Sequence, residues 1–254
     1  MDWELLKTHM KKHAPEKGGP VVVAFSGGVD SSVVALAALD AFASRSLALT
    51  VDTGLVLGHE LERAGNVAAL MGMWHKVLPV HVLHDRRVAE NGPERCYWCK
   101  RSIFEAIRET FGENAVLMDG TTADDDPARP GMRALSEFGV VSPLRFAGVP
   151  KDKVRSLARE RGLPNHDLPS NSCLATRVPM GQPLDRRVLF VVNAVENRLV
   201  AAGVDDLRAR VDELMMTIWY PSRHAGIVAG ERKNVQEMIA SSVLEGVVFK
   251  EWRT

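Results

Sequence analysis

Val21-Val22-Val23-Ala24-Phe25-Ser26-Gly27-Gly28-Val29-Asp30-Ser31-Ser32 is the stretch of this sequence that indicates its fold. The five apolar residues 21–25 are typical of a parallel strand covered on both faces. Residues 31–43 are rich in Ala, Leu and Val and contain no Gly or Pro, which favours a buried helix directly after the glycine loop. The stretch therefore predicts a strand, a tight loop and a helix.

The same alternation of strands and helices continues along the chain. A short helix is predicted at 2–12, further strands at 47–52, 75–80 and 115–119, and further helices at 59–71 and 99–111. This alternation is typical of an α/β protein with a doubly wound parallel sheet. Ligands of such sheets gather at the carboxyl ends of the strands. Here these ends are the loops at Ser26, Asp52, 81–96 and Gly120-Thr121.

A different pattern follows residue 119. We predict a helix at 151–161, a long irregular stretch at 162–183, a helix at 184–202, strands at 207–212, 215–220 and 225–228, a helix at 231–242 and a strand at 246–250. Long irregular stretches are usually functional or disordered. We expect a main domain at 1–180 and a smaller C-terminal α+β domain at 181–254.

Composition and charge exclude some classes of function. The chain has 32 Lys plus Arg and 32 Asp plus Glu, so its summed charge does not favour a nucleic-acid partner. No apolar run approaches the roughly 18 residues that a membrane span needs, so we expect no membrane partner and a cytoplasmic location. A homo-oligomer is compatible with the sequence.

The glycine loop has the residues that a nucleotide phosphate requires. Gly27 and Gly28 allow close approach to backbone N–H groups, and a helix N-terminus supplies more donors. The Ser26, Ser31 and Ser32 hydroxyls can donate as well. Asp30 is repelled by phosphates unless it caps the helix or meets a cation, and we expect capping with Mg²⁺ nearby. An ordinary Ser/Gly-rich turn is the alternative, but the flanking strand and helix favour phosphate binding.

This loop resembles the PP-loop of N-type ATP pyrophosphatases, which include GMP synthetase, NAD synthetase and thiouridine-forming enzymes. It lacks the Gly-Lys-Ser/Thr ending of the Walker loop. The resemblance implies an adenine nucleotide alpha hydrolase-like fold, ATP as co-substrate, and adenylation with loss of pyrophosphate. Candidate nucleotide-binding residues are Ser26, Gly27, Gly28, Asp30, Ser31, Ser32, Asp52, Gly120 and Thr121. Asp124 and Asp125 join Asp30 as candidate Mg²⁺ ligands.

Three cysteines form a second candidate site. Cys96 and Cys99 begin a predicted helix in a Cys-x-x-Cys pair, and Cys173 lies in the long irregular stretch. Three thiolates can hold a 4Fe-4S cluster with one open iron, three ligands plus water would suit zinc, and the pair alone could be a redox dithiol. Cys173 could also be a buried apolar residue, although its polar neighbours disfavour that.

Taken in order, these motifs resemble the LarE family of ATP-dependent sulfur transferases, which build the nickel-pincer cofactor of lactate racemase. The similarity extends through most of the chain. Besides residues 26–32, it includes Arg95-Cys96-Tyr97-Trp98-Cys99-Lys100, Asp119-Gly120-Thr121-Thr122-Ala123-Asp124-Asp125, Arg129-Pro130-Gly131, Ser142-Pro143-Leu144, Gly162-Leu163-Pro164 and Cys173-Leu174-Ala175-Thr176-Arg177.

The resemblance implies that ATP adenylates a carboxylate of a pyridinium dicarboxylate mononucleotide and that sulfur then displaces AMP. In part of the family a sacrificial cysteine at the position of Cys173 supplies the sulfur. In members with three cysteines the sulfur is carried on a 4Fe-4S cluster, and the resemblance therefore implies that Cys96, Cys99 and Cys173 are ligands. Arg177, Arg208 and Arg210 are the candidate cations for the substrate phosphate and the developing charge. Glu196 is a further candidate for the same site, although a helical salt bridge explains it equally well.

The sequence departs from the family pattern after Val211, where it reads Asp212-Glu213-Leu214-Met215-Met216-Thr217-Ile218-Trp219. The identity of the sulfur acceptor is therefore open, as is the sulfur donor. A PP-loop tRNA thiolase is one alternative, disfavoured by the balanced charge. A nucleotide-binding sensor without turnover is another.

Overall fold

The computed structural model describes residues 3–15, 18–169 and 171–252. Contacts between Cα atoms divide the chain into two compact units. The first unit comprises residues 1–54, 60–82 and 96–170, and the second comprises 55–59, 83–95 and 171–254. Two short segments of the second unit thus interrupt the first in sequence. The predicted division into domains at 1–180 and 181–254 stays a prediction.

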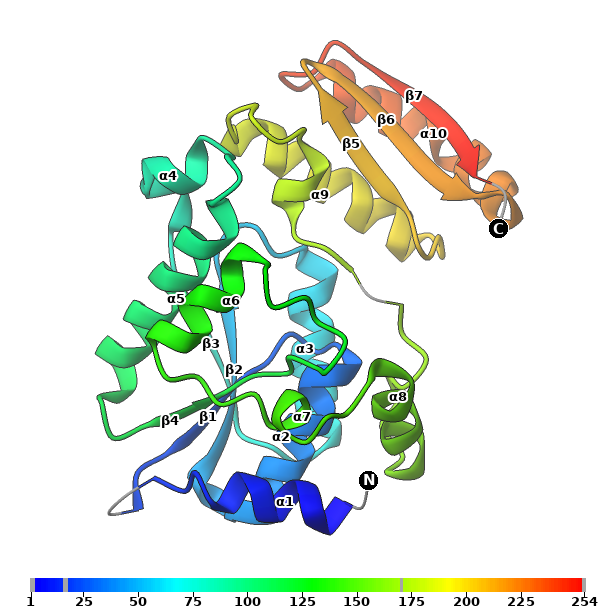
Figure 1. Ribbon diagram of the computed structural model, residues 1–254. Helices are drawn as coiled ribbons and strands as arrows, with labels where there is room; N and C mark the ends of the chain where they lie inside the picture. The colour runs from blue at the N-terminus through cyan, green and yellow to red at the C-terminus, as the bar shows by residue number, and fades with distance from the viewer. Residues whose placement is uncertain (1–2, 16–17, 170, 253–254) are drawn as a thin grey trace. The chain divides into compact units, whose positions relative to one another are not determined.

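The first unit is built on a four-stranded parallel sheet (Figure 1). Its strands are β1 (Val21–Ala24), β2 (Ser46–Asp52), β3 (His75–Pro79) and β4 (Val116–Met118), in the spatial order β3-β2-β1-β4. The chain moves outward from β1 to β3 and then returns to the other side of β1. The switch point of the sheet therefore lies between β1 and β4, where ligands of such folds bind. This architecture confirms the predicted fold class.

Helices cover both faces of this sheet. They are α1 (Trp3–Lys11), α2 (Val29–Phe42), α3 (Gly58–Leu70), α5 (Arg95–Phe111), α6 (Pro130–Glu137), α7 (Pro143–Phe146) and α8 (Lys151–Glu160). The first residues of α3 and α5 are assigned to the second unit. Asp2, the predicted first residue of the N-terminal helix, lies outside the described residues. The α6 and α7 helices were not predicted.

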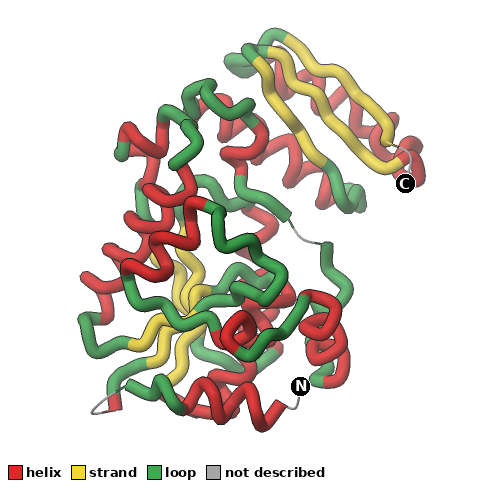
Figure 2. Tube along the Cα trace, viewed as in Figure 1, coloured by secondary structure: helices red, strands yellow, loops and turns green. Residues whose placement is uncertain are grey.

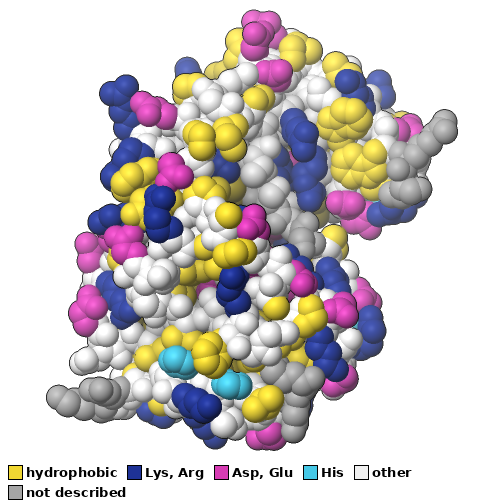
Figure 3. Space-filling model, in the orientation of Figure 1, with side chains coloured by type: hydrophobic (Ala, Val, Ile, Leu, Met, Phe, Trp, Pro, Cys, Tyr) yellow, Lys and Arg dark blue, Asp and Glu magenta, His cyan; other side chains and the backbone are white. Residues whose placement is uncertain are grey.

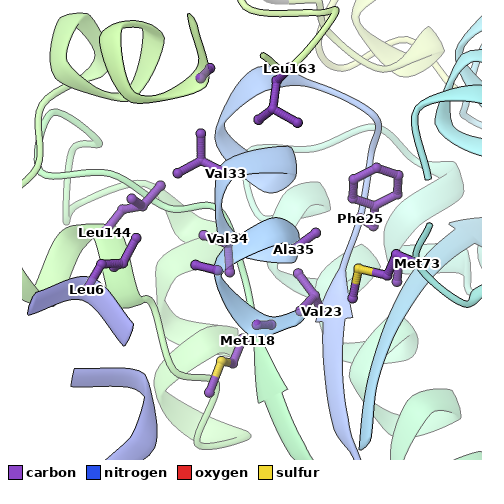
Figure 4. Close-up of a cluster of buried hydrophobic side chains, with 14 of the residues drawn as sticks. Leu6, Val23, Phe25, Val33, Val34, Ala35, Met73, Met118, Leu144 and Leu163 are labelled. Carbon is purple, nitrogen blue, oxygen red and sulfur yellow. The ribbon is translucent and has the colours of Figure 1, made fainter. Parts of the chain in front are cut away.

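Two hydrophobic clusters explain why β1 is apolar at every position. Val21 and Val23 pack with α1, α2, α3, α7 and α8 on one face, whereas Val22 packs with α5 and α6 on the other. Figure 4 shows α2 at the centre of the first cluster, with Phe25 and Leu163 nearby. The predicted two-sided burial of this strand is confirmed, and the core fixes both ends of the glycine loop.

The second unit is a small α+β assembly. It contains α4 (Arg86–Ala89), the 3-10 turn η4 (Leu174–Arg177), α9 (Arg186–Ala201), β5 (Arg208–Asp212), β6 (Met215–Pro221), α10 (Ala225–Ala240) and β7 (Gly246–Trp252). β5 and β6 are antiparallel, and β6 and β7 are parallel. Figure 2 shows the three strands side by side with helices beside them. The expected α+β character is thus observed.

One predicted strand is wrong. Residues 225–228 form the first turn of α10, which is continuous to Ala240. The run Ala-Gly-Ile-Val is too short for its periodicity to distinguish a strand from a helical turn, and it continues through Ala229 and Gly230 into the helix that we predicted only from residue 231. A parallel connection between β6 and β7 requires such a long crossover. No helix among the described residues is long and apolar enough to cross a membrane.

Candidate nucleotide and thiol sites

The glycine loop occupies the turn between β1 and α2. Gly27 has φ +70°, and a Cβ added there would lie 2.7 Å from the Ala64 Cα on α3. A side chain is strained at this φ, and real Cβ atoms essentially never approach another heavy atom so closely. Val29 is buried in the core, so it anchors the loop at the start of the helix. Glycine is therefore required at position 27 by the packing of α3 against the loop.

A second glycine brings the β4 loop against the start of α2. A Cβ on Gly120 would lie 2.7 Å from the Ser31 backbone nitrogen. The loops after β1 and β4 therefore meet at the switch point of the sheet. Thr121 is buried, and its hydroxyl donates to Asp119 Oδ2 at 2.5 Å. This hydrogen bond stabilises the conformation of the loop after β4, which packs against the start of α2.

Asn165 supports the phosphate loop, a role that the sequence pattern did not predict. Its Nδ2 donates to the Gly27 carbonyl and to the Ser32 hydroxyl, both at 2.8 Å. The Ser32 hydroxyl donates in turn to the Gly28 carbonyl at 2.9 Å. Ser32 is completely buried, so its hydroxyl stabilises the loop conformation from the protein interior. The only signal in the sequence was a polar residue after the Gly162-Leu163-Pro164 turn.

A hydrogen-bonded pair, Thr50 and His75, stabilises the end of β1 directly before the glycine loop. Thr50 Oγ1 donates to the Phe25 carbonyl at 2.7 Å and lies 2.8 Å from His75 Nε2. Thr50 has one hydroxyl hydrogen, so His75 Nε2 is the donor in the second bond. Burial lowers the pKa of His75, which keeps the ring neutral and suits this arrangement.

The start of α2 fits a phosphate. Gly28 is the N-cap, and no side chain among the described residues caps the first turn. Its N–H groups are therefore available to an anion, and the helix dipole favours negative charge there. Asp30 is the second residue of the helix and does not cap it, which corrects our expectation. The reason is geometric, since a capping side chain must precede the first turn.

Asp30 has the properties of a cation ligand. Its Oδ1 is buried and has no hydrogen-bond partner among the described residues. Burial raises the pKa of Asp30. The charge of Lys151 lowers this pKa, the charges of Asp125 and Asp124 raise it, and the net direction is up. An ionised, orphaned carboxylate oxygen beside an anion site is stabilised by a divalent cation. These observations fit Mg²⁺ accompanying a triphosphate.

The other predicted acidic residues have partners. Asp125 Oδ2 accepts from the Thr122 N–H and hydroxyl at 2.8 and 2.9 Å. Burial raises the pKa of Asp125, but the Thr122 hydrogen bonds and Lys151 outweigh it and the net direction is down. Asp124 Oδ2 accepts from the Lys151 N–H at 2.7 Å. Asp52, at the end of β2, accepts from the Gly54 N–H at 2.9 Å. Asp30 is therefore the best candidate ligand.

Asp30→Asn is expected to stabilise the protein in the absence of nucleotide. A carboxyl whose folded pKa is raised weakens the fold once it ionises, so its stabilising contribution is present at low pH and lost as pH rises through the folded pKa. The variant should therefore melt at a higher temperature than the unchanged protein at pH 7. The difference should vanish below about pH 3.9, the unperturbed value for Asp. Thermal melts across this pH range measure it.

The same variant should lose the benefit of Mg²⁺. Mg-ATP stabilises a binding protein by mass action, and this increment should fall because the carboxylate is gone, with affinity reduced about tenfold. Asp126→Asn is the matched control, because Asp126 is an exposed carboxylate of the same unit. An unchanged Mg²⁺ dependence in Asp30→Asn would exclude Asp30 as a cation ligand.

Cys96 and Cys99 both lie in the first turns of α5, in the first unit. Cys96 is exposed and Cys99 half-buried, and neither forms a disulfide among the described residues. Gly131, at the start of α6, approaches this end of the helix, since a Cβ there would lie 3.1 Å from the Lys100 Cδ. Arg133 stacks on the Tyr97 ring with its guanidinium carbon 3.7 Å from the centroid. The α6 helix therefore packs against the end of α5 that carries the cysteine pair.

Cys173 belongs to the second unit and is an exposed thiol at the N-cap of η4. Ser170, the first of its predicted polar neighbours, lies outside the described residues. Arg177 is only 1% exposed and is ion-paired with Glu196. Arg208 and Arg210 alternate along β5 with the buried Ala209 and Val211, so they share the other face of that strand, as predicted.

The thiols thus belong to both units, two to the first and one to the second. Within the described residues, no group of three or more His, Cys, Asp or Glu side chains is arranged to hold a metal ion. The donor chemistry fits a cluster, because none of the three cysteines forms a disulfide and each is exposed or half-buried. The roles of these cysteines and arginines therefore remain proposals.

A parallel sheet with an uncapped helix and a glycine loop at its switch point defines a PP-loop nucleotide-binding protein of the ATP pyrophosphatase type. The NAD synthase family model matches residues 3–91. The chain is 30% identical over 222 residues to the pyridinium-3,5-bisthiocarboxylic acid mononucleotide synthase of Lactiplantibacillus plantarum, covering 85% of this chain and 80% of that protein. It therefore belongs to the LarE family of ATP-dependent sulfur transferases, which use ATP with Mg²⁺.

Two further relatives place this result in context. An uncharacterized protein of Synechocystis sp. is 32% identical over 204 residues, or 79% of this chain and 76% of that protein. The glutamine-hydrolyzing GMP synthase of Anaplasma marginale is 33% identical over 204 residues, or 67% of this chain and 36% of that protein. The similarity to GMP synthase covers a smaller share of both chains than the similarity to the synthase of Lactiplantibacillus plantarum does.

Proposed function

We propose that this enzyme adenylates a carboxylate of a pyridinium-3,5-dicarboxylate mononucleotide and replaces the AMP with sulfur. The observation that carries the proposal is the similarity over 85% of the chain to a synthase of the bisthiocarboxylic acid mononucleotide. The product for which that relative is named carries sulfur where a carboxylate carries oxygen. A carboxylate is a poor electrophile, so it needs activation before sulfur can enter.

The first step uses the phosphate loop. The α2 N–H groups hold the ATP phosphates, and Asp30 binds the accompanying Mg²⁺, which neutralises phosphate charge. A carboxylate oxygen of the substrate attacks the α phosphorus, the bond between the α and β phosphates breaks, and pyrophosphate leaves. The product is an acyl adenylate. Arg208 and Arg210 provide the cations for the phosphate of the mononucleotide.

The second step uses the thiols. We propose that Cys96, Cys99 and Cys173 together ligate a 4Fe-4S cluster, which when bound supplies an open iron where inorganic sulfide can be held. Inorganic sulfide would form a bond to the acyl carbon while the bond between that carbon and the AMP oxygen breaks, so that AMP leaves and a thiocarboxylate forms.

Pyrophosphate release tests the adenylation step. Incubation with Mg-ATP and the dicarboxylate mononucleotide should release pyrophosphate, and the same mononucleotide without carboxylates should not. Addition of sulfide should then give a thiocarboxylate detectable by its mass. Stimulation by bulk tRNA with a steep salt dependence would indicate a tRNA thiolase instead. ATP binding without pyrophosphate release under any of these conditions would indicate a sensor.

Iron analysis tests the cluster. Anaerobically purified protein should be brown and contain about four irons per chain. Each of Cys96→Ala, Cys99→Ala and Cys173→Ala should lower the iron content, because each removes one ligand. Ser136→Ala, a change of similar size at an exposed position of the first unit, should not. Stoichiometric zinc with no iron in the anaerobic protein would overturn this assignment.

On the face drawn in Figure 3, Lys and Arg side chains are interspersed with Asp and Glu among the described residues. The whole chain likewise balances 32 basic against 32 acidic residues. Binding to a polynucleotide backbone depends on an excess of cations along its path. These features support a small-molecule acceptor over tRNA.

A further inference from the structure

The most deeply buried ion pair among the described residues adjoins Cys173. Arg177 Nε donates to Glu196 Oε1 at 2.8 Å, and its Nη2 donates to Glu196 Oε2 at 2.9 Å. Both side chains are about 1% exposed. Arg177 ends the η4 turn and Glu196 lies on α9. The pair is therefore a bidentate salt bridge between the loop that contains Cys173 and the long helix α9, both in the second unit.

Arg177 also contacts groups on both sides of Cys173 in sequence, a backbone carbonyl before it and a side-chain hydroxyl after it. Its Nη1 donates to the Ser172 carbonyl at 2.9 Å and contacts the Thr176 hydroxyl at 3.1 Å. Its Nη2 donates to Asn171 Oδ1 at 3.2 Å. A guanidinium has five N–H donors, and these partners, all within the protein, occupy all of them. Arg177 therefore has no donor left for a substrate phosphate.

Glu196 extends this bond to the strand that carries the two candidate arginines. Its Oε1 accepts from the Ala209 N–H at 2.7 Å as well as from Arg177. Ala209 stands between Arg208 and Arg210 on β5. One buried carboxylate thus joins the loop of Cys173 to the strand of Arg208 and Arg210, all within the second unit.

We propose that Arg177 and Glu196 are positioning residues, which hold Cys173 at a fixed position relative to β5 and do not themselves touch the substrate. The consequence for sulfur transfer rests on the function proposed above, whereas the effect on the loop does not. The pair gives the exposed thiol one backbone conformation. It thereby fixes the spacing between the sulfur ligand and the arginines of β5.

A buried ion pair is weak evidence for stability, because matched apolar residues often stabilise a fold as well. Removing only one partner leaves a buried charge unpaired and damages the fold. This asymmetry supplies a test that separates positioning from stability. Arg177→Met combined with Glu196→Met removes both charges and keeps roughly the same volume.

The double variant should fold and melt within a few degrees of the unchanged protein, and it should bind ATP equally well. Hydrogen exchange at the Leu174 and Thr176 amides, which donate to Leu55 and Cys173 carbonyls, should become at least about tenfold faster. Sulfur transfer should fall about 100-fold. Arg198→Met with Glu231→Met is the matched control. This solvent-accessible ion pair also includes a residue of α9, which it joins to α10, and its removal should change none of these readouts.

Unchanged exchange and sulfur transfer in the folded double variant would overturn the proposal. Should the double variant not fold, Arg177→Lys serves in its place, because lysine keeps the charge opposite Glu196 but cannot bridge Ser172 and Thr176 at once. Its loop amides should still exchange faster, and unchanged exchange would again refute the proposal. Faster exchange in an enzyme that transfers no sulfur at all would leave the positioning pair standing and refute the proposed function.

Discussion

Gly27→Ala is expected to weaken ATP binding by about 100-fold or more, which corresponds to about 2.7 kcal/mol. The added Cβ would lie 2.7 Å from the Ala64 Cα and 2.9 Å from its nitrogen. Both are backbone atoms of α3, so no side chain can rotate away. Either the loop or the helix must move, and the N–H groups at the start of α2 then lose their alignment with the phosphates. Isothermal titration with Mg-ATP measures the loss.

Gly72→Ala is the matched control for this change. Gly72 has φ +66°, close to the φ of +70° at Gly27, but nothing lies within 4 Å of an added Cβ. Both variants therefore carry the left-handed strain of about 1 to 2 kcal/mol, and only Gly27→Ala adds the clash. Gly72→Ala should bind ATP normally despite a lower melting temperature. Equal ATP affinity in both variants would show that the loop does not bind phosphate.

Cys173→Ala is expected to abolish sulfur transfer while ATP binding and pyrophosphate release continue. Cys173 is exposed, so its loss leaves no cavity and should change stability by less than about 0.5 kcal/mol. The phosphate loop contains no cysteine and is held by Asn165 and Gly120, both of the first unit. Thiocarboxylate formation, pyrophosphate release and melting temperature, measured on one preparation, test the separation.

Cys173→Ser controls for the shape of the site, because a hydroxyl is nearly the size of a thiol but a poor ligand for iron. It should behave as Cys173→Ala does in sulfur transfer. Loss of ATP binding together with sulfur transfer in either variant would mean that Cys173 has a structural role. Full sulfur transfer in both variants would remove Cys173 from the mechanism.

The NAD synthase family model ends at residue 91, before the first cysteine of the chain. The matched part contains β1, β2, β3 and the phosphate loop. The cysteines, η4, α9 and the C-terminal sheet all lie beyond it. This division agrees with a chemistry in two stages, in which adenylation belongs to the wider superfamily and sulfur transfer to the LarE family.

The sequence by itself determined the parallel sheet and the position of the phosphate loop. Both depend on local signals, because a doubly buried strand is apolar at each position and a glycine loop before an Ala-rich helix is recognised within a dozen residues. Hydrophobic periodicity gave the wrong prediction at residues 225–228, because a run of four such residues is compatible with a strand or with a helical turn. Only the requirement for a parallel crossover decides between them.

Only the tertiary structure decided which groups the site has available. Asp30 lost its expected capping role because Gly28 starts the helix, and Arg177 changed from a candidate substrate ligand to a saturated, buried group. Asn165 and Glu196 gained roles through contacts 138 and 13 residues away in sequence. Hydrogen-bond partners at such separations are chosen by packing, and the free energy of burying an unpaired polar group enforces the choice.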